Sequence, residues 1–101
     1  MKREIFNKYV DYIADISACD KEELFVKSKK RWRVDARHLL YYLCYTRPMR
    51  VSDIQDYMQS WGYEISHSSI IHGIKQVCQK VEDDKDYKSI IKDIKLILNH
   101  V

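Results

Sequence analysis

Glycine and proline are scarce in this sequence, and their scarcity limits the folds that it can adopt. The 101 residues contain two Gly and one Pro, whereas a β-sandwich or small barrel needs a turn about every 8–12 residues. No two glycines lie close together, which excludes a glycine-rich phosphate loop and gives no reason to expect a nucleotide ligand. A chain of this length fits one domain over residues 1–101, with one modest hydrophobic core.

Cysteine spacing and the absence of long apolar runs exclude two further classes. Cys19, Cys44 and Cys78 are widely separated and form no Cys-x-x-Cys pair, so we expect reduced, mostly buried thiols, no zinc finger or disulfide framework, and no metal or other cofactor. No apolar run approaches the ~20 residues that span a bilayer, and the start of the chain lacks a signal-peptide stretch. The sequence therefore predicts a cytoplasmic protein with no membrane partner.

Positive charge is concentrated in one quarter of the chain. The formal net charge is +3, but residues 27–50 contain eight Lys and Arg against Asp35 alone, which gives +7. Residues 1–26 carry −2, and residues 51–81 and 82–101 carry −1 each. Such a concentration favours an anionic partner, with nucleic acid ahead of an acidic protein or a lipid surface.

Apolar residues recur at helical spacing in five segments, and no segment has the alternation typical of a strand. The clearest stripe comprises Ile70, Ile71, Ile74, Val77, Cys78 and Val81, and the last stripe extends to Leu98 and Val101. The second segment ends before Pro48, because the residue before a proline is disfavoured in helical geometry. The predicted helices cover about 3–16, 34 or 35 to 47, 51–60, 66–81 and 86–99, with a short helical turn ending near Phe25 and a basic loop over 27–33. The expected fold is an all-α compact bundle of about five helices.

The third and fourth predicted helices form a short helix, a connection and a longer helix, which is the order of a helix-turn-helix. Gly62 in the connection is a candidate left-handed cap. Since the apolar stripe of the longer helix faces the core, its polar N-terminal turn points outward and would be presented to base edges in the major groove. That turn holds small or flat hydrogen-bonding side chains: Ser66, His67, Ser68, Ser69 and His72. Gly73 in mid-helix costs ~1 kcal/mol relative to Ala, which indicates close approach of a neighbouring helix or of nucleic acid.

Each of these features also has a simpler interpretation. Ser66 and Ser69 are typical helix-capping residues. His67 and His72 are also consistent with ordinary surface residues, and the basic loop is also consistent with a solvated surface that binds nothing. A tyrosine group is more consistent with packing than with base stacking; it comprises Tyr41, Tyr42 and Tyr45. The five-residue spacing of His67 and His72 puts them on different helix faces, which argues against a metal pair.

Three stretches in order resemble the C-terminal DNA-binding domain of the bacterial replication initiator DnaA, and the resemblance covers nearly the whole chain from about Asn7. The stretches are Ser28-Lys29-Lys30-Arg31, Ala36-Arg37-His38-Leu39-Leu40-Tyr41-Tyr42-Leu43 and His67-Ser68-Ser69-Ile70-Ile71-His72-Gly73-Ile74-Lys75-Gln76-Val77. The third is similar to the signature of that family's recognition helix. The signature reads His, two small hydroxyl residues, two aliphatics, a spacer, a small residue, then a basic and an aliphatic position.

The resemblance implies a helix-turn-helix of the Trp-repressor kind that binds double-stranded DNA. It implies base contacts in the major groove from His67, Ser68 and Ser69, and a minor-groove contact from an arginine of the basic loop, for which Arg31 is our choice. It also implies that Arg37 and Lys75 lie near phosphates or groove edges. The rest of the predicted DNA-binding set is Lys29, Lys30, Arg33, Ser66 and His72. The chain departs from the family at Ile65-Ser66, where Arg-Asp is usual, and at Gln55, where Gly is usual.

The sequence thus favours a non-enzymatic protein that binds double-stranded DNA, and the resemblance implies a role in replication initiation or its regulation. No Cys-His or carboxylate pair has a sequence context that indicates an activated catalytic group. Two alternatives stay open: a transcriptional regulator that reuses the same module, and a protein-interaction module whose basic loop binds an acidic partner. The first helix carries Tyr12 and a negative surface, so it is a candidate for self-association or for binding a replication protein.

Overall fold

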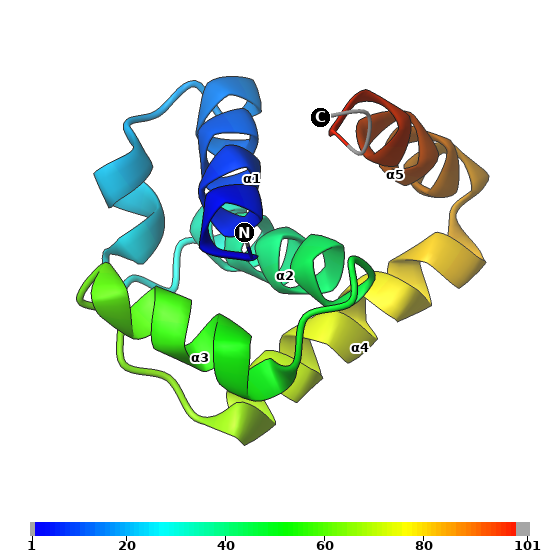
Figure 1. The fold of residues 1–101 in the computed structure, drawn as a ribbon. Coiled ribbons are helices and arrows are strands. Elements are labelled where there is room, and N and C mark those ends of the chain that lie inside the picture. Colours follow the sequence, from blue (N-terminus) through cyan, green and yellow to red (C-terminus); the bar gives the residue numbers. More distant parts are fainter. Residues whose placement is uncertain (1, 99–101) are drawn as a thin grey trace.

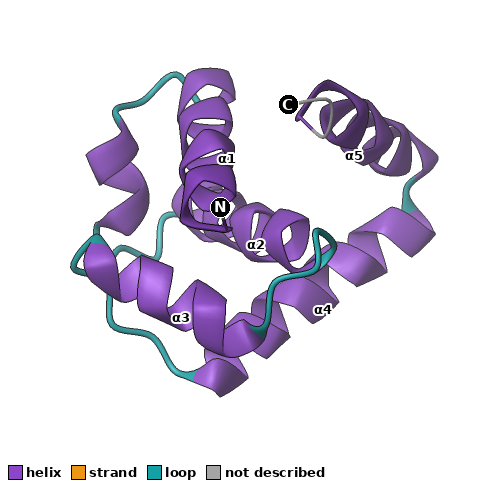
Figure 2. Cartoon of the chain, in the orientation of Figure 1, coloured by secondary structure: helices purple, strands orange, loops and turns teal. Residues whose placement is uncertain are grey.

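The computed structural model describes residues 2–98, which form five α-helices, one short 3-10 helix and no strand (Figure 1, Figure 2). In chain order these are α1 (Lys2–Ile16), the 3-10 helix η1 (Lys21–Phe25), α2 (Arg31–Tyr45), α3 (Val51–Ser60), α4 (His67–Asp83) and α5 (Lys85–Leu98). The expected all-α bundle is confirmed. The predicted helix end at Asn99, the apolar position Val101 and the side chain of Leu98 lie outside what is described.

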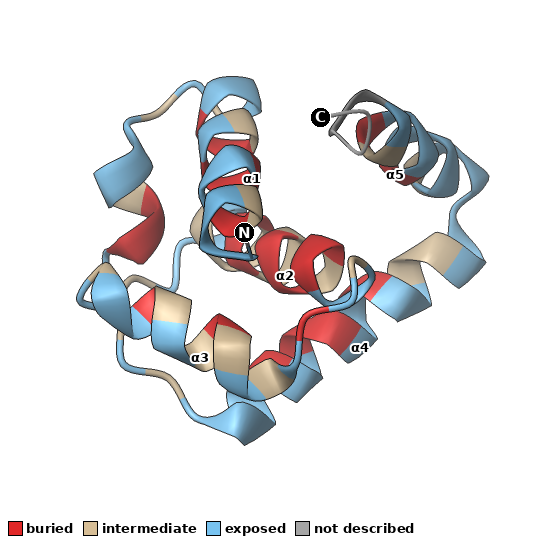
Figure 3. Cartoon of the chain, viewed as in Figure 1, coloured by how far each residue is buried: buried red, intermediate tan, exposed pale blue. Residues whose placement is uncertain are grey.

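One apolar core lies where α1, α2, α3 and α4 meet. Buried residues line the faces that these helices turn toward one another (Figure 3). α2 contacts both α1 and α4, and its contact with α4 is the most extensive in the bundle. Large side chains that are almost completely buried come from all four helices: Phe6, Tyr9, Leu40, Tyr41, Ile54, Met58 and Ile70. α5 packs on α4 and adds Ile91 and Ile94 to the buried residues.

α2 begins at Arg31, three to four residues earlier than predicted, so the last part of the predicted basic loop is helical. The Lys30 carbonyl accepts the N–H groups of Arg33 and Val34 at 3.1 Å, and the Arg31 side chain forms an ion pair with Asp35 one turn later. The prediction was wrong because the first turn is polar. Hydrophobic periodicity carries no signal where a helix end projects from the core.

The connection between α3 and α4 is held by tight hydrogen bonds and by a ring stack. Gly62 has φ +83°, which confirms the predicted left-handed position, and its N–H donates to the Gln59 carbonyl at 2.8 Å. The preceding residue, Trp61, stacks on Phe25 of η1 with ring centroids 4.6 Å apart. This stack ties the connection to the end of η1, so the start of α4 and the loop after η1 lie close together.

Candidate nucleic-acid interface

α4 begins with a capped turn whose side chains face solvent. Ser66 is the N-cap: its Oγ accepts the Ser69 N–H at 3.2 Å and donates to the Ser69 Oγ at 3.0 Å. The capping interpretation is therefore confirmed for Ser66, while Ser69 supplies the N–H group that is capped. Ile70, Ile74 and Val77 of the predicted stripe are buried, whereas Ile71 and Cys78 are exposed because they lie at the edge of the stripe that α2 and α3 do not cover. The expectation of mostly buried cysteines is therefore wrong, since only Cys44 is buried. The predicted residues at this tip are all exposed: Ser66, His67, Ser68, Ser69 and His72.

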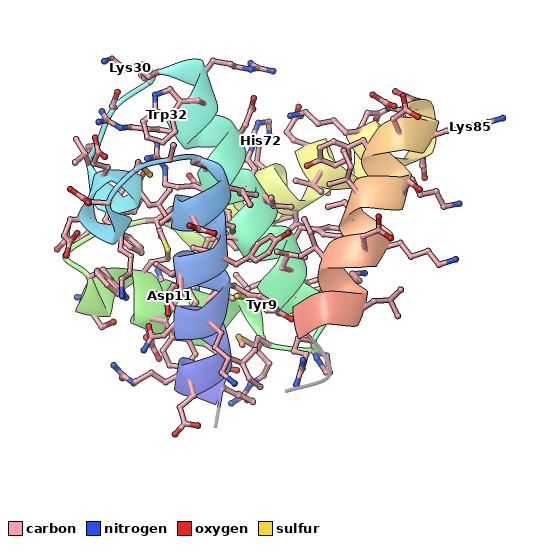
Figure 4. The ribbon with its side chains drawn as sticks, turned by 90° about the horizontal axis from the view of Figure 1, so that it is seen from above. Tyr9, Asp11, Lys30, Trp32, His72 and Lys85 are labelled. Carbon is pink, nitrogen blue, oxygen red and sulfur yellow. The ribbon has the colours of Figure 1, made fainter. Side chains whose placement is uncertain are left out.

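The tip of α4 and the basic loop line one groove of about 650 Å³. The loop contributes Lys27, Ser28 and Lys29, the tip contributes Ser66, Ser68, Ser69 and His72, and the floor includes Val34, Arg37, His38, Tyr41 and Tyr63. Lys30 and His72 lie along the same edge of the molecule, with Asp11 on the other side of the bundle (Figure 4). The groove therefore brings Lys27 and Lys29 together with the serines of the tip and His72, whereas Lys30, Arg31 and His67 are not among the residues that line it.

Arg37 is buried, which corrects its expected position near phosphates. Its side chain is only 5% exposed. Nη1 donates to the carbonyls of Leu24 and Val26 at 3.0 and 3.1 Å, and Nη2 donates to the Ser28 carbonyl at 2.9 Å. The guanidinium also lies 5.0 Å from the ring centroid of Tyr63. Arg37 thus holds the backbone of the basic loop from inside the fold and is not free to contact a phosphate.

Arg33 also points inward, whereas Arg31 points outward. The Arg33 side chain is 14% exposed and forms an ion pair with Glu23 at 3.4 Å, and its guanidinium lies 5.0 Å from the ring centroid of Trp32. Its expected DNA contact is therefore not supported. The Arg31 side chain is 81% exposed, and within residues 2–98 its one ion pair is with the partly exposed Asp35 at 3.4 Å, an interaction of a kind that contributes little. The outward cations of the segment are Lys27, Lys29, Lys30 and Arg31.

Gln55 of α3 lies outside the predicted set of DNA-binding residues but contacts one of them, His67. Its Nε2 donates to the Ile65 carbonyl at 2.8 Å, and its Oε1 lies 2.8 Å from Nε2 of His67. One side chain thereby joins α3, the connection and the first residue of α4. The only signal in the sequence is the departure from the family pattern at this position.

Gly73 is explained by the close approach of α2. A Cβ on this residue would lie 2.8 Å from both His38 Cδ2 and Tyr41 Cδ2, so the neighbouring helix supplies the predicted contact. His38 in turn meets His72 edge to face, with ring centroids 6.0 Å apart. Burial, and secondarily the nearby His72, lowers the pKa of His38 below its usual value.

No protein-family model matches this chain, and neither curated proteins nor solved structures yield a match. Within residues 2–98, no helix is long and apolar enough to cross a membrane. The same residues contain no group of three His, Cys, Asp or Glu side chains placed to hold a metal ion. The resemblance to the initiator domain thus stays a prediction, and a function has to be argued from the geometry of this face.

Proposed function

We propose that this protein is a sequence-specific double-stranded DNA-binding module. It docks through the cations of residues 27–31 and places the N-terminal turn of α4 in the major groove. The observation that carries the proposal is the shared groove: Lys27 and Lys29 of the basic loop and the exposed α4 tip line it together, although 37 or more positions separate them in the sequence. An α-helix fits the major groove, which is about 12 Å wide.

Docking is electrostatic in this proposal. Lys27, Lys29, Lys30 and Arg31 are exposed and bind phosphates or, for Arg31, enter the adjacent minor groove. Lys75 is exposed on α4, about two turns after His67, and adds a fifth cation. Arg33 and Arg37 take no part as direct contacts, because one is paired with Glu23 and the other is bonded to carbonyls.

Sequence is read by the tip of α4. His67 and Ser68 are exposed and present a ring nitrogen and a hydroxyl to base edges. Ser69 shares its hydroxyl with Ser66, so its contribution is smaller. His67→Ala is expected to relax base preference at a cost of ~1–3 kcal/mol, whereas Lys29→Ala weakens binding to all duplexes about equally.

The role in replication initiation or its regulation rests on the resemblance to the initiator domain. Transcriptional regulation would use the same interface. Footprinting on DNA that carries origin-like repeats and promoters separates the two roles, because protection confined to promoters would favour the regulator.

A salt titration tests the proposal as a whole. If the five exposed cations each neutralise one phosphate, the slope of log affinity against log salt is about −4.5. The double variant Lys29→Ala/Lys30→Ala reduces it to about −2.7. The matched control Lys88→Ala/Lys92→Ala removes the same charge from exposed sites on α5 and leaves the slope unchanged. Salt-insensitive binding to a random duplex pool, or equal effects of the two double variants, would overturn the proposal.

A further inference from the structure

The amide of Gln55 has only one acceptable orientation. Its Nε2 lies 2.8 Å from the Ile65 carbonyl oxygen, so this group donates there. Turning the amide over would bring two oxygens to that separation, with no proton between them. The Gln55 Oε1 therefore faces His67 at 2.8 Å.

This orientation determines which nitrogen of His67 carries a proton. A carbonyl oxygen accepts hydrogen bonds and cannot donate them, so His67 Nε2 is the donor across the 2.8 Å contact. In a neutral imidazole one nitrogen donates and the other accepts. Nδ1 of His67 is then left with a lone pair on an exposed residue, and no hydrogen bond from another group within residues 2–98 engages it.

We infer that Gln55 is a positioning residue that makes His67 a hydrogen-bond acceptor toward DNA, so that His67 selects a base with an exocyclic amine. In the major groove, adenine N6 and cytosine N4 are donors, whereas guanine N7 and O6 and thymine O4 are acceptors. A lone pair on Nδ1 attracts the first two bases and repels the others. The inference rests on the proposed function and states which base edges the tip of α4 reads.

Base selection identifies the position that His67 reads. Duplexes are selected from a random pool with the parent protein and with His67→Ala, in mildly alkaline buffer, which favours neutral imidazole. The position whose preference disappears in the variant is expected to be adenine or cytosine. A guanine or thymine there, or no position that loses its preference, would overturn the inference.

Base analogues then test the amine itself. Purine replaces adenine, or 2-pyrimidinone replaces cytosine, at that position; each analogue lacks only the exocyclic amine, and the two arms distinguish the two bases. The parent is expected to bind the analogue about 2- to 10-fold more weakly, the range of one net hydrogen bond. Equal affinity for the analogue and the natural base would overturn the inference.

The role of Gln55 is tested with Gln55→Met, which keeps the length of the side chain and loses both hydrogen bonds. The control is Gln59→Met, one turn later on α3 and exposed. Gln55→Met is expected to bind the analogue and the natural base nearly equally, while Gln59→Met keeps the parent's discrimination. Thermal melting confirms that both variants fold. A Gln55→Met protein that keeps full discrimination would overturn the positioning role.

Nitrogen NMR of the free protein separates failure of this inference from failure of the proposed function. The ring signals of His67 are assigned by their loss in His67→Ala. They are expected to show a protonated Nε2 and an unprotonated Nδ1. A protonated Nδ1 in the neutral ring would overturn the inference even if the protein binds DNA. Absence of any salt-sensitive duplex binding would overturn the proposed function together with the inference that depends on it.

Discussion

Arg37→Met is the substitution whose effect follows most directly from the structure. Methionine retains a long, flexible apolar side chain, while the guanidinium and its bonds to three carbonyls are lost, one in η1 (Leu24) and two after it (Val26 and Ser28). The change leaves the exposed lysines of the loop in place. It therefore tests whether a buried arginine, and not the loop sequence itself, holds this part of the interface.

The expected loss of stability combines several terms. Leu24 is 1% exposed, so its carbonyl would lose a partner that water cannot easily replace, at a cost of ~1–3 kcal/mol. The carbonyls of Val26 and Ser28 are partly buried and regain some hydration, and the contact of the guanidinium with Tyr63 adds ~1 kcal/mol. Relief from burying a charge offsets part of this sum. The net loss is about 2–4 kcal/mol, a large share of the 5–15 kcal/mol typical of a whole domain.

Urea unfolding followed by circular dichroism measures this loss. A change near the middle of the range would also lower Tm by about 12–24 °C for a domain of this size. The matched control is Arg31→Met, on the same helix, which removes an exposed arginine and is expected to change stability by no more than about 0.5 kcal/mol. A loss below ~1 kcal/mol for Arg37→Met, or equal losses for the two variants, would refute the assignment of Arg37 as the residue that holds the loop.

Three further predictions concern α2 and its contact with α4. Gly73→Ala gains helix propensity but forces a methyl group against His38 and the buried ring of Tyr41. We therefore expect the free energy of unfolding, measured in urea, to fall by ~1–2 kcal/mol. A variant as stable as the parent, or more stable, would contradict the close contact. His38 has a lowered pKa in the folded state, so the unfolded chain binds a proton more readily than the folded protein. The stabilising contribution of neutral His38 is therefore present above about pH 6.5 and is lost as pH falls. The fall in unfolding free energy between about pH 7 and about pH 5 should be smaller in His38→Gln than in the parent. Cys44 is fully buried, and burial raises its pKa. A thiol reagent should therefore label the exposed Cys78 in the folded protein and Cys44 only after unfolding, as detected by mass spectrometry. Rapid labelling of Cys44 under native conditions would contradict its burial.

The helices with a regular apolar face were predictable from the sequence, and the start of α2 was not. The stripe through Ile70, Ile74 and Val77 is buried as expected, because periodic burial against a core leaves a direct trace in residue order. Residues 31–33 carry no such trace. The ion pair that Arg33 forms with Glu23 of η1 joins residues ten positions apart, a contact that no local pattern encodes.

The candidate site was predictable as a set of exposed residues but not as a network. Capping by Ser66 follows from local rules, since the acceptor and the N–H group are three residues apart. The contact of Gln55 with His67 spans 12 residues and the bonds of Arg37 to the loop span 9–13. Both depend on how α3, η1 and the loop pack, which is a property of the tertiary fold. Arg31, Arg33 and Arg37 were all predicted to contact DNA for the same reason.

The inward position of Arg37 nevertheless supports an anionic partner at the groove. Its guanidinium is bonded to carbonyls and not to a carboxylate, so its positive charge is not neutralised, unlike that of Arg33 beside Glu23. A charge held behind a wall of low dielectric is poorly screened by solvent, and a concave surface focuses its field. Arg37 lines the groove together with Lys27 and Lys29, opposed there by Glu64 as the one carboxylate among the described lining residues. Removing Arg37 thus affects the proposed interface in two ways. The loop loses its internal support, and the groove loses a positive charge that attracts phosphates through its field without direct contact.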